Sequence, residues 1–281
     1  MEVTEVATHK NFIDIDEAFK SKSPRLYKYL PGAVTRYLKR IVHQNQINDF
    51  IDRNADKFEF EFVDAIIEEF GANVIVKGAE NIRTTGGVIY AANHPLGGLD
   101  AISFLHILGR YRTDVKFIVN DILLQLKNLS GIFIGVNKHG KNAKEVLDTI
   151  DNMYASEQAV LIFPAGLVSR RHNGVSKDLM WRKSFIGMAR KHMRDIIPIH
   201  IEGTNSNFFH NLSWWRKKLG IKANIEMLYL VDEMYRQHDK TITVTFGKPL
   251  PWQLFDESIT DADWAHRVKE HVYAMVDNDQ S

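Results

Sequence analysis

The feature that most constrains the fold is an alternation of strand-like and helix-like segments that begins after Gly71. Short apolar runs predict strands at residues 73–77, 87–92, 115–119, 131–136, 159–163, 196–201, 226–231 and 241–247. Helical spacing fills several intervals, at residues 100–108, 122–129, 143–155 and 181–193. This alternation predicts an α/β fold with a central, mostly parallel sheet flanked by helices. Because only the polar segment 232–240 separates the last two predicted strands, we expect the sheet to be mixed.

A helical segment precedes the predicted sheet. Residues 21–48 have a helical pattern that Pro24 and Pro31 interrupt. Residues 47–70 continue at roughly helical spacing and end at Gly71, a residue type that commonly terminates helices. The predicted parts are an N-terminal helical, membrane-proximal segment (residues 1–71), an α/β domain (72–254) and an acidic C-terminal helix (255–281).

The formal net charge is only +1, from 36 Lys and Arg against 35 Asp and Glu, but the charges are unevenly placed. Basic residues mixed with Tyr or Trp gather in segments 18–48, 167–194 and 203–225, and acids gather at both ends of the chain. Such mixtures suit an anionic membrane surface, where the rings lie at headgroup level. The alternative is a set of solvated helix faces. No helix-turn-helix, RRM or zinc pattern favours a nucleic-acid partner.

Composition excludes several classes of protein. The chain has no cysteine, so disulfides, thiolate nucleophiles and Cys-ligated zinc are excluded. The acidic N-terminus lacks the apolar core of a signal peptide, and no stretch reaches the roughly 18 apolar residues that span a bilayer. We therefore expect a cytoplasmic protein that contacts the inner face of the cytoplasmic membrane only peripherally.

The segment 89–100 carries the clearest chemical signal. An apolar strand stops at Asn93 and His94, a turn with Gly97 and Gly98 follows, and Asp100 opens a helix. Ligands of open α/β sheets bind at the carboxyl ends of strands. There His94 can serve as a general base, and Asp100 can hold its second ring nitrogen. The alternative is a turn histidine followed by an ordinary helix cap.

A second strand, at residues 159–163, also runs into a turn and then into basic residues. The turn is Phe163–Pro164–Ala165–Gly166, and Ser169, Arg170 and Arg171 follow it. Exposed backbone N–H groups, a hydroxyl and two guanidinium groups suit a phosphate or carboxylate. Taken alone, a Pro-Gly turn is ordinary chain reversal.

In order and spacing, the two motifs resemble those of the PlsC-like glycerolipid (lysophospholipid) acyltransferases. That family has Asn-His-x4-Asp, a Gly-x-x-Phe-Ile-type strand, Phe-Pro-Glu-Gly and a Val-Pro-type strand. The matching segments are Asn93–His94 with Asp100, residues 131–134, residues 163–166 and residues 197–199. The resemblance covers about residues 74–249 and is greatest to a bacterial branch often labelled putative hemolysin or aminolipid (ornithine or glycine lipid) acyltransferase. It implies a glycerol-3-phosphate acyltransferase-like sheet.

The chain departs from the family pattern at three places. Five residues separate His94 from Asp100 instead of four, and the glycine pair can absorb the extra one. Ala165 stands where the family has Glu, and Val136 stands where it has Arg. Because the absent Glu and Arg help the family bind glycerol phosphate, their loss favours a different acceptor.

The resemblance implies an enzyme that moves a fatty acyl group from acyl-ACP or acyl-CoA to the hydroxyl of a lyso-lipid. In this reading His94 is the general base and Asp100 its orienter, with oxyanion donors around Gly166. No metal or cofactor is needed beyond the acyl thioester co-substrate. The residues expected to contact substrate are Asn93, Gly97, Gly98, Lys138, Phe163, Pro164, Gly166, Ser169, Arg170, Arg171 and Lys183.

Partners and alternatives follow from this reading. The expected partners are a lipid acceptor, an acyl carrier protein or CoA thioester, and an anionic membrane. Residues 21–40 and Trp214–Trp215 with the cations after them are the candidate anchors. The acceptor is either lysophosphatidate-like or a mono-acylated amino acid such as an ornithine or glycine lipid. A thioester or ester hydrolase is less favoured because no Gly-x-Ser-x-Gly elbow is present, and a non-catalytic lipid-binding protein would not need the His–Asp pair.

Overall fold

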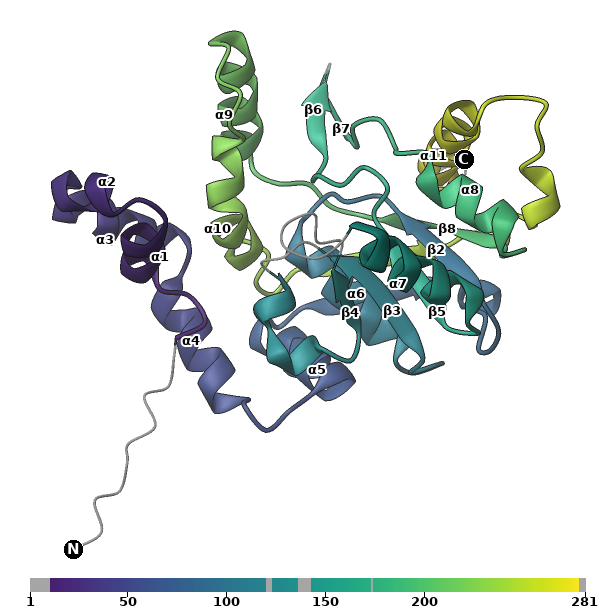
Figure 1. The fold of residues 1–281 in the computed structure, drawn as a ribbon, viewed down its shortest axis with the longest axis horizontal. Helices are drawn as coiled ribbons and strands as arrows, with labels where there is room; N and C mark the ends of the chain where they lie inside the picture. The colour runs from purple at the N-terminus through teal and green to yellow at the C-terminus, as the bar shows by residue number, and fades with distance from the viewer. Residues whose placement is uncertain (1–10, 120–122, 136–142, 173, 278–281) are drawn as a thin grey trace, which may run out of the picture. The chain divides into compact units, whose positions relative to one another are not determined.

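The computed structural model describes residues 11–119, 123–135, 143–172 and 174–277 (Figure 1). The chain divides into two compact units, Met1–Asp56 and Lys57–Ser281. The division comes before the boundary expected at Gly71, because α5 (Glu59–Glu69) packs against α6 (Gly98–Leu108) in the second unit. The absence of a side chain at Gly109, which caps α6, lets the Phe60 ring approach the backbone.

The first unit consists of four short helices. These are α1 (Ile15–Lys22), α2 (Pro24–Tyr29), α3 (Gly32–Ile41) and α4 (Gln44–Arg53). Pro24 opens α2 and Pro31 precedes α3, so both prolines lie where their missing N–H costs no helical hydrogen bond. The Asn48 amide of α4 exchanges two hydrogen bonds with the backbone of Ile13, which fastens the chain before α1 to α4.

The second unit is built on a seven-stranded sheet with the strand order β1-β9-β8-β2-β5-β3-β4. Its strands are β1 (Asn73–Lys77), β2 (Val88–Ala92), β3 (Val115–Val119), β4 (Phe133–Gly135), β5 (Ala159–Ile162), β8 (Ile196–Ile201) and β9 (Thr241–Phe246). β8 and β9 are antiparallel, and the other neighbouring pairs are parallel. The predicted mixed, mostly parallel sheet flanked by helices is confirmed.

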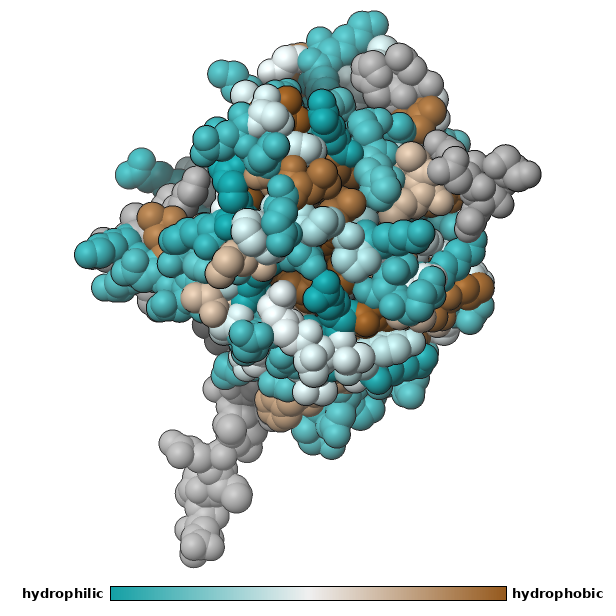
Figure 2. Space-filling model, turned by 90° about the vertical axis from the view of Figure 1, so that its right-hand side faces the viewer, coloured by the Kyte–Doolittle hydropathy of each residue, from teal (hydrophilic) through white to brown (hydrophobic). Residues whose placement is uncertain are grey.

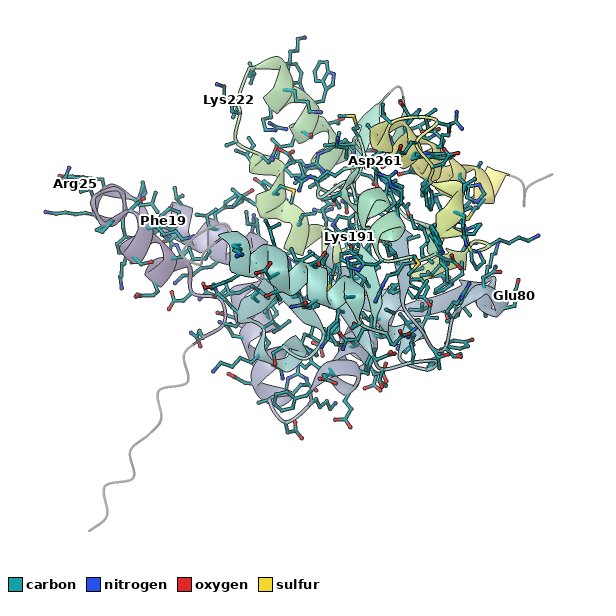
Figure 3. All side chains as sticks on the ribbon, turned by 45° about the vertical axis from the view of Figure 1, so that its right-hand side comes forward. Phe19, Arg25, Glu80, Lys191, Lys222 and Asp261 are labelled. Carbon is teal, nitrogen blue, oxygen red and sulfur yellow. The ribbon has the colours of Figure 1, made fainter. Side chains whose placement is uncertain are left out.

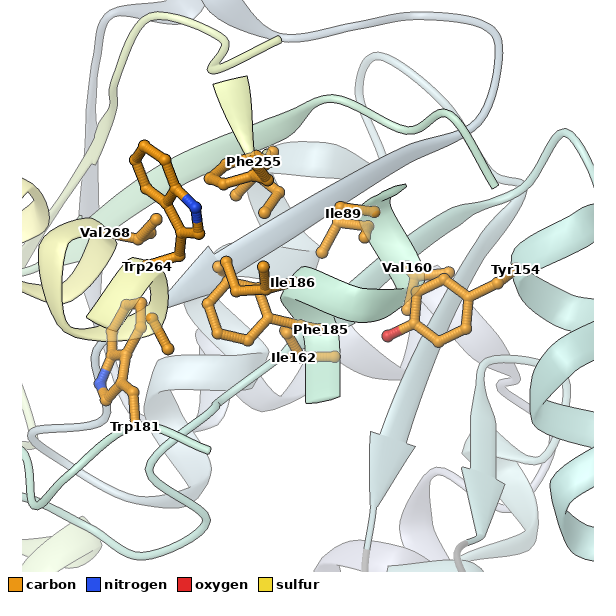
Figure 4. Packing of buried hydrophobic residues seen from close by; sticks show 14 of the residues in the cluster. Ile89, Tyr154, Val160, Ile162, Trp181, Phe185, Ile186, Phe255, Trp264 and Val268 are labelled. Atoms are coloured by element: carbon orange, nitrogen blue, oxygen red, sulfur yellow. The ribbon is translucent and has the colours of Figure 1, made fainter. Parts of the chain in front are cut away.

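Helices cover both faces of this sheet. On one face, α7 (Ala143–Ala155), α8 (Ser184–Lys191) and α11 (Asp261–Asp277) enclose an apolar cluster. Phe185 and Ile186 of α8 lie beside Ile162 of β5 in its centre (Figure 4). On the other face, Tyr90 of β2 contacts Phe104 of α6 ring to ring at 5.3 Å. All five residues of β2 are therefore buried, and the strand that leads to His94 is held from both sides.

The surface is mostly hydrophilic on the side that Figure 2 shows, with apolar residues in small groups between polar ones. No helix among the described residues is long and apolar enough to cross a bilayer. Within that described part, large exposed apolar side chains include Trp214, Trp215 and Leu219 at the end of α9 (Asn207–Lys218).

Several predicted elements differ from the structure. The strand expected at 226–231 is wrong, because the chain there forms a 3-10 turn (Ile225–Tyr229) that leads into α10 (Leu230–Tyr235). Glu226 is fully buried in this turn, facing two arginines, and no alternation of apolar residues signals such a partner. The sheet is mixed because β9 reverses against β8. The helix expected at 122–129 is described only as two single 3-10 turns, Leu123–Gln125 and Lys127–Leu129. Neither α9 nor the hairpin β6 (Arg170–His172) and β7 (Val175–Lys177) was predicted.

Candidate active site

Three neighbouring parallel strands end at one edge of the sheet and place the predicted motifs together. β2 lies between β5 and β8, so the chain leaves these strands at the same edge, at Asn93–His94, Phe163 and Glu202. The Asn93 amide fastens two of these ends, since its Nδ2 donates to the Ile201 carbonyl at 2.9 Å and its Oδ1 accepts from the Ile201 N–H at 2.6 Å. Asn93 is buried, and its amide holds the strand end that carries His94.

His94 and Asp100 form the pair expected from the sequence. The His94 Nδ1 lies 2.8 Å from the Asp100 Oδ2. The Asp100 side chain is fully buried, whereas the His94 side chain is 19% exposed. The same Asp100 oxygen accepts from the backbone N–H groups of Leu96 and Gly97, at 2.9 and 3.0 Å. An ionised carboxylate only accepts, so the Nδ1 carries the proton and the Nε2 of the neutral ring is left as a base.

The turn between the two residues depends on Gly97. Its φ of 91° and ψ of −126° lie in a region that side chains other than glycine rarely adopt. This conformation turns the chain back sharply, so the turn accommodates one residue more than the family motif has. Asp100 therefore still contacts the His94 ring. Gly98 is exposed at the first position of α6.

Burial raises the pKa of Asp100, and the hydrogen bonds from His94, Leu96 and Gly97 oppose that rise. The three donors supply the stabilisation that an ionised carboxylate needs away from water. The histidine ring also stacks on Phe163, with the ring centroids 4.2 Å apart and the planes inclined by 13°. Carboxylate and phenyl ring together fix the orientation of the imidazole.

The Phe163–Gly166 turn lies beside this pair. Gly166 has φ 66°, and its N–H already donates to the Phe163 carbonyl, so the oxyanion donor expected there is not the Gly166 N–H itself. The Arg182 guanidinium lies over Gly166, within 3.3 Å of where a Cβ would stand, and the Arg182 N–H donates to Pro164. Pro164 is buried, and Ala165 belongs to the apolar cluster, so no carboxylate replaces the family's Glu here.

Asp178 is a site residue that the sequence reasoning missed. It is the single acid in the basic segment 167–194. That isolated negative charge is the one feature of the sequence that points to a buried partner role. Its Oδ1 accepts from the His94 N–H at 3.1 Å and from the Ser169 hydroxyl at 2.6 Å, and its Oδ2 accepts from Trp181 at 2.8 Å. The Ser169 N–H in turn donates to the His94 carbonyl at 2.7 Å. Ser169 is thus buried support for His94 and not the exposed ligand that the sequence indicated.

The predicted cations divide into buried and exposed sets. The Arg170 guanidinium is buried, pairing with Glu226 at 2.9 Å and donating to Ser213, so the structure does not offer it as the expected free anion ligand. Arg216 pairs with the same Glu226 at 2.8 Å. Arg171 and Lys183 are exposed, as is Arg182, which sequence reasoning did not single out. Lys138 and Val136 lie outside the described residues.

The described part of the chain contains no group of three or more His, Cys, Asp or Glu side chains that could hold a metal ion. The edge of the sheet presents an oriented base, His94, and exposed cations in the turns beside it. An arrangement of this kind can deprotonate a hydroxyl that a bound substrate supplies.

Comparison with known proteins gives concordant findings. The model of the family described as "Acyltransferase" matches residues 17–277. A lyso-glycine lipid O-acyltransferase of Bacteroides thetaiotaomicron is 47% identical over 264 residues, covering 94% of this chain and 97% of the relative. The protein of the same name from Phocaeicola vulgatus is 44% identical over 264 residues, covering 94% of this chain and 95% of the relative.

A solved structure, the 1-acyl-sn-glycerophosphate acyltransferase PlsC from Thermotoga maritima, matches with a TM-score of 0.49 and 16% identity. The match covers 86% of this chain and 95% of that one. The resemblance to the PlsC-like acyltransferases and to their aminolipid branch is confirmed by the family match and by the two curated relatives.

Proposed function

The chain belongs to the acyltransferase family, and from that premise we propose that it acylates the hydroxyl of a lyso-glycine lipid, using an acyl thioester as donor. The observation that carries this proposal is the His94–Asp100 pair at the carboxyl edge of the sheet, with one ring nitrogen held by a buried carboxylate. The names of the two relatives support the glycine-lipid acceptor. Ala165, where the family pattern has Glu, agrees with an acceptor other than glycerol phosphate.

In the proposed reaction, His94 Nε2 takes the proton of the acceptor hydroxyl as its oxygen attacks the thioester carbonyl. The new C–O bond forms, the C–S bond breaks, and the departing thiolate receives the proton from the imidazolium. Asp100 stabilises the imidazolium and keeps the ring in the reactive tautomer. The enzyme supplies no nucleophile of its own, so the acyl group passes directly from donor to acceptor. The donor is acyl-ACP or acyl-CoA, and no further cofactor is required.

A lipid acceptor requires contact with a membrane, and we propose two places for it. In the first unit, Tyr29 is 80% exposed and Arg25 of α2 extends outward (Figure 3). In the second unit, Trp214 and Trp215 are each 53% exposed at the end of α9, and Lys218 lies over both rings. Trp and Lys together suit the headgroup region of an anionic bilayer. This supports a peripheral protein on the inner face of the cytoplasmic membrane.

The decisive experiment is an acyl-transfer assay with purified protein. Labelled acyl-ACP and acyl-CoA are each offered with mono-acylated glycine, mono-acylated ornithine and lysophosphatidate. We expect transfer to the glycine lipid and a loss of at least about 100-fold in His94→Ala. A matched control exists in His106, whose Nδ1 contacts Asp64 at 2.6 Å in the same manner, away from the motif. His106→Ala should keep full activity.

Three outcomes would overturn the proposal. These are no transfer to any acceptor, full activity in His94→Ala, or release of free fatty acid without transfer, which is the behaviour of a hydrolase. The membrane contact is tested separately by flotation with liposomes containing an anionic lipid. Trp214→Ala with Trp215→Ala should reduce binding, and equal binding by this variant would exclude α9 as an anchor.

A further inference from the structure

A pocket of about 540 Å³ opens near the same edge of the sheet. Its lining includes Arg171, Thr204, Asn205, Glu233, Arg236 and Lys240. Residues 204–207 follow the end of β8, which Asn93 fastens beside His94. Between them, Gly203 packs against Leu96 of the catalytic turn, where a Cβ would come within 2.7 Å of the Leu96 side chain. The loop that continues into the pocket wall thus packs against the turn that carries His94.

Asn205 is the unusual residue of this pocket. It is 1% exposed, and neither its Oδ1 nor its Nδ2 has a hydrogen-bond partner in the part of the chain that the structure describes. Buried side-chain amides are normally paired, because an unmet donor or acceptor retains its desolvation cost. An unpaired amide in a pocket wall offers one donor group and one acceptor to a polar ligand group.

The charges of the pocket favour a single negative charge. Arg171, Arg236 and Lys240 line it, and all three are exposed. Arg236 pairs with Asp232 at 3.0 Å, and Arg171 donates to the Asn207 side chain at 2.6 Å, so the remaining positive charge of the pocket is small. The opposing acid, Glu233, is buried and already accepts from the N–H and the hydroxyl of Ser206. Guanidinium groups bind planar carboxylates well, whereas the Glu233 charge behind Ser206 disfavours a doubly charged phosphate.

His210 stiffens the wall on the side of Asn205. Its Nδ1 accepts from the Arg171 N–H at 3.2 Å, so the Nε2 carries the proton and donates to the Thr204 hydroxyl at 3.1 Å. The Thr204 hydroxyl then donates to the backbone carbonyl of Asn205 at 3.2 Å. This chain of bonds joins β6 to the loop after β8 and sets Asn205 in place before any ligand arrives.

We propose that this pocket binds the free carboxylate of the acceptor's glycine headgroup, with the Asn205 amide and the Arg171 and Lys240 cations as its donors. The inference rests on the proposed function and deepens it. A glycine that joins its lipid through the amine keeps a free carboxylate, which matches the single planar charge that the pocket favours. The pocket thereby selects amino-acid lipids over uncharged lyso-lipids, and the hydroxyl of the same molecule lies toward His94.

The test compares an acceptor that has a free glycine carboxylate with its methyl ester. In the wild-type protein the ester should have a KM about 10–100-fold higher at similar kcat. In Lys240→Gln and in Asn205→Ala the KM of the carboxylate acceptor should rise toward that of the ester, while the KM of the ester should not change. Lys248→Gln is the matched control, because Lys248 is exposed just beyond the other end of β9, which Lys240 precedes.

Binding provides a readout that does not need activity. Titration of N-acetylglycine should give a weak affinity that Lys240→Gln reduces about tenfold and that Lys248→Gln retains. The inference would be overturned if the KM of the ester, divided by the KM of the carboxylate acceptor, were the same in the wild type and in Lys240→Gln. It would also be overturned if Lys240→Gln changed only the KM of the acyl donor. If the wild type transfers to no acceptor, the proposed function fails. In that case the N-acetylglycine titration alone shows whether the pocket binds a carboxylate: a loss of affinity in Lys240→Gln supports the site, and no binding by the wild type rules it out.

Discussion

The backbone N–H of His94 donates to the carboxylate of Asp178, 84 positions further along the chain, at 3.1 Å. The same carboxylate holds Ser169 and Trp181, so one buried acid ties the catalytic turn, the strand after the Phe163 turn and the start of the α8 region together. We expect Asp178→Asn to lower the free energy of unfolding by about 1–3 kcal/mol. The new side-chain NH₂ cannot accept a hydrogen bond, so at least one of the three donors that face the carboxylate loses its acceptor. The kcat should fall as well, since His94 loses its backbone anchor. Urea unfolding and steady-state kinetics measure the two effects.

The control for this prediction is Asp151→Asn. Asp151 pairs with His192 at 2.9 Å and with Lys191, and that contact lies partly in solvent. Its loss should change stability by less than about 1 kcal/mol and leave kcat unchanged. Equal effects of the two substitutions would show that Asp178 contributes no more to stability and kcat than an exposed acid does.

Asp100 acts on the chemistry through the ring of His94. Asp100→Asn keeps the size of the side chain but replaces an acceptor-only group, so it removes the preference for the Nδ1–H tautomer and the charge that stabilises the imidazolium. We expect kcat to fall about 10²–10⁴-fold with little change in the KM of either substrate. Asp64→Asn, which alters the similar contact with His106, should leave kcat unchanged. A kcat within threefold of wild type in Asp100→Asn would contradict the assigned role.

Glu226 holds two buried guanidinium groups, those of Arg170 and Arg216. Removal of its charge leaves both without compensation, and such a loss in a buried pair typically destabilises a protein by about 3–5 kcal/mol. We therefore expect Glu226→Gln to lower the urea midpoint strongly. Asp232→Asn, which alters a more exposed ion pair with Arg236, should change it little. Equal urea midpoints for the wild type and Glu226→Gln would mean that the Glu226 side chain stabilises the fold only through packing.

The sequence predicts those parts of the site that are local in the chain. His94 and Asp100 lie within one strand–turn–helix unit, so their contact follows from the apolar strand, the glycine pair and the helix start. The sheet is predictable for the same reason, because each buried strand carries its own apolar run. The pairing of β9 with β1 and β8 and the helix α9 were not evident, since tertiary contacts decide them.

Buried polar contacts between distant segments escaped the sequence reasoning. Arg170 and Ser169 were expected to be exposed because they are polar and follow a turn. Their burial depends on Glu226 and Asp178, which lie 56 and 9 positions away. Glu226 begins an apolar run, and that pattern predicts a strand. The pattern cannot show that arginines from other elements pack against the Glu226 carboxylate. Such partners become evident only once the fold is known.

We expect His210 to make the free energy of unfolding depend on pH. Burial and the neighbouring arginines Arg171 and Arg170 lower its pKa from 6.5 to about 4, so the folded chain binds fewer protons than the unfolded chain between these values. Its contribution is therefore fully present above about pH 6.5 and is lost as the pH falls toward 4, to a total on the order of 3 kcal/mol. His210→Asn, which keeps an acceptor for the Arg171 N–H, should flatten the dependence of the urea midpoint on pH between 7 and 5. His266→Asn, a substitution of an exposed histidine on α11, should retain the wild-type slope. Parallel slopes for wild type and His210→Asn would show that His210 does not titrate in this way.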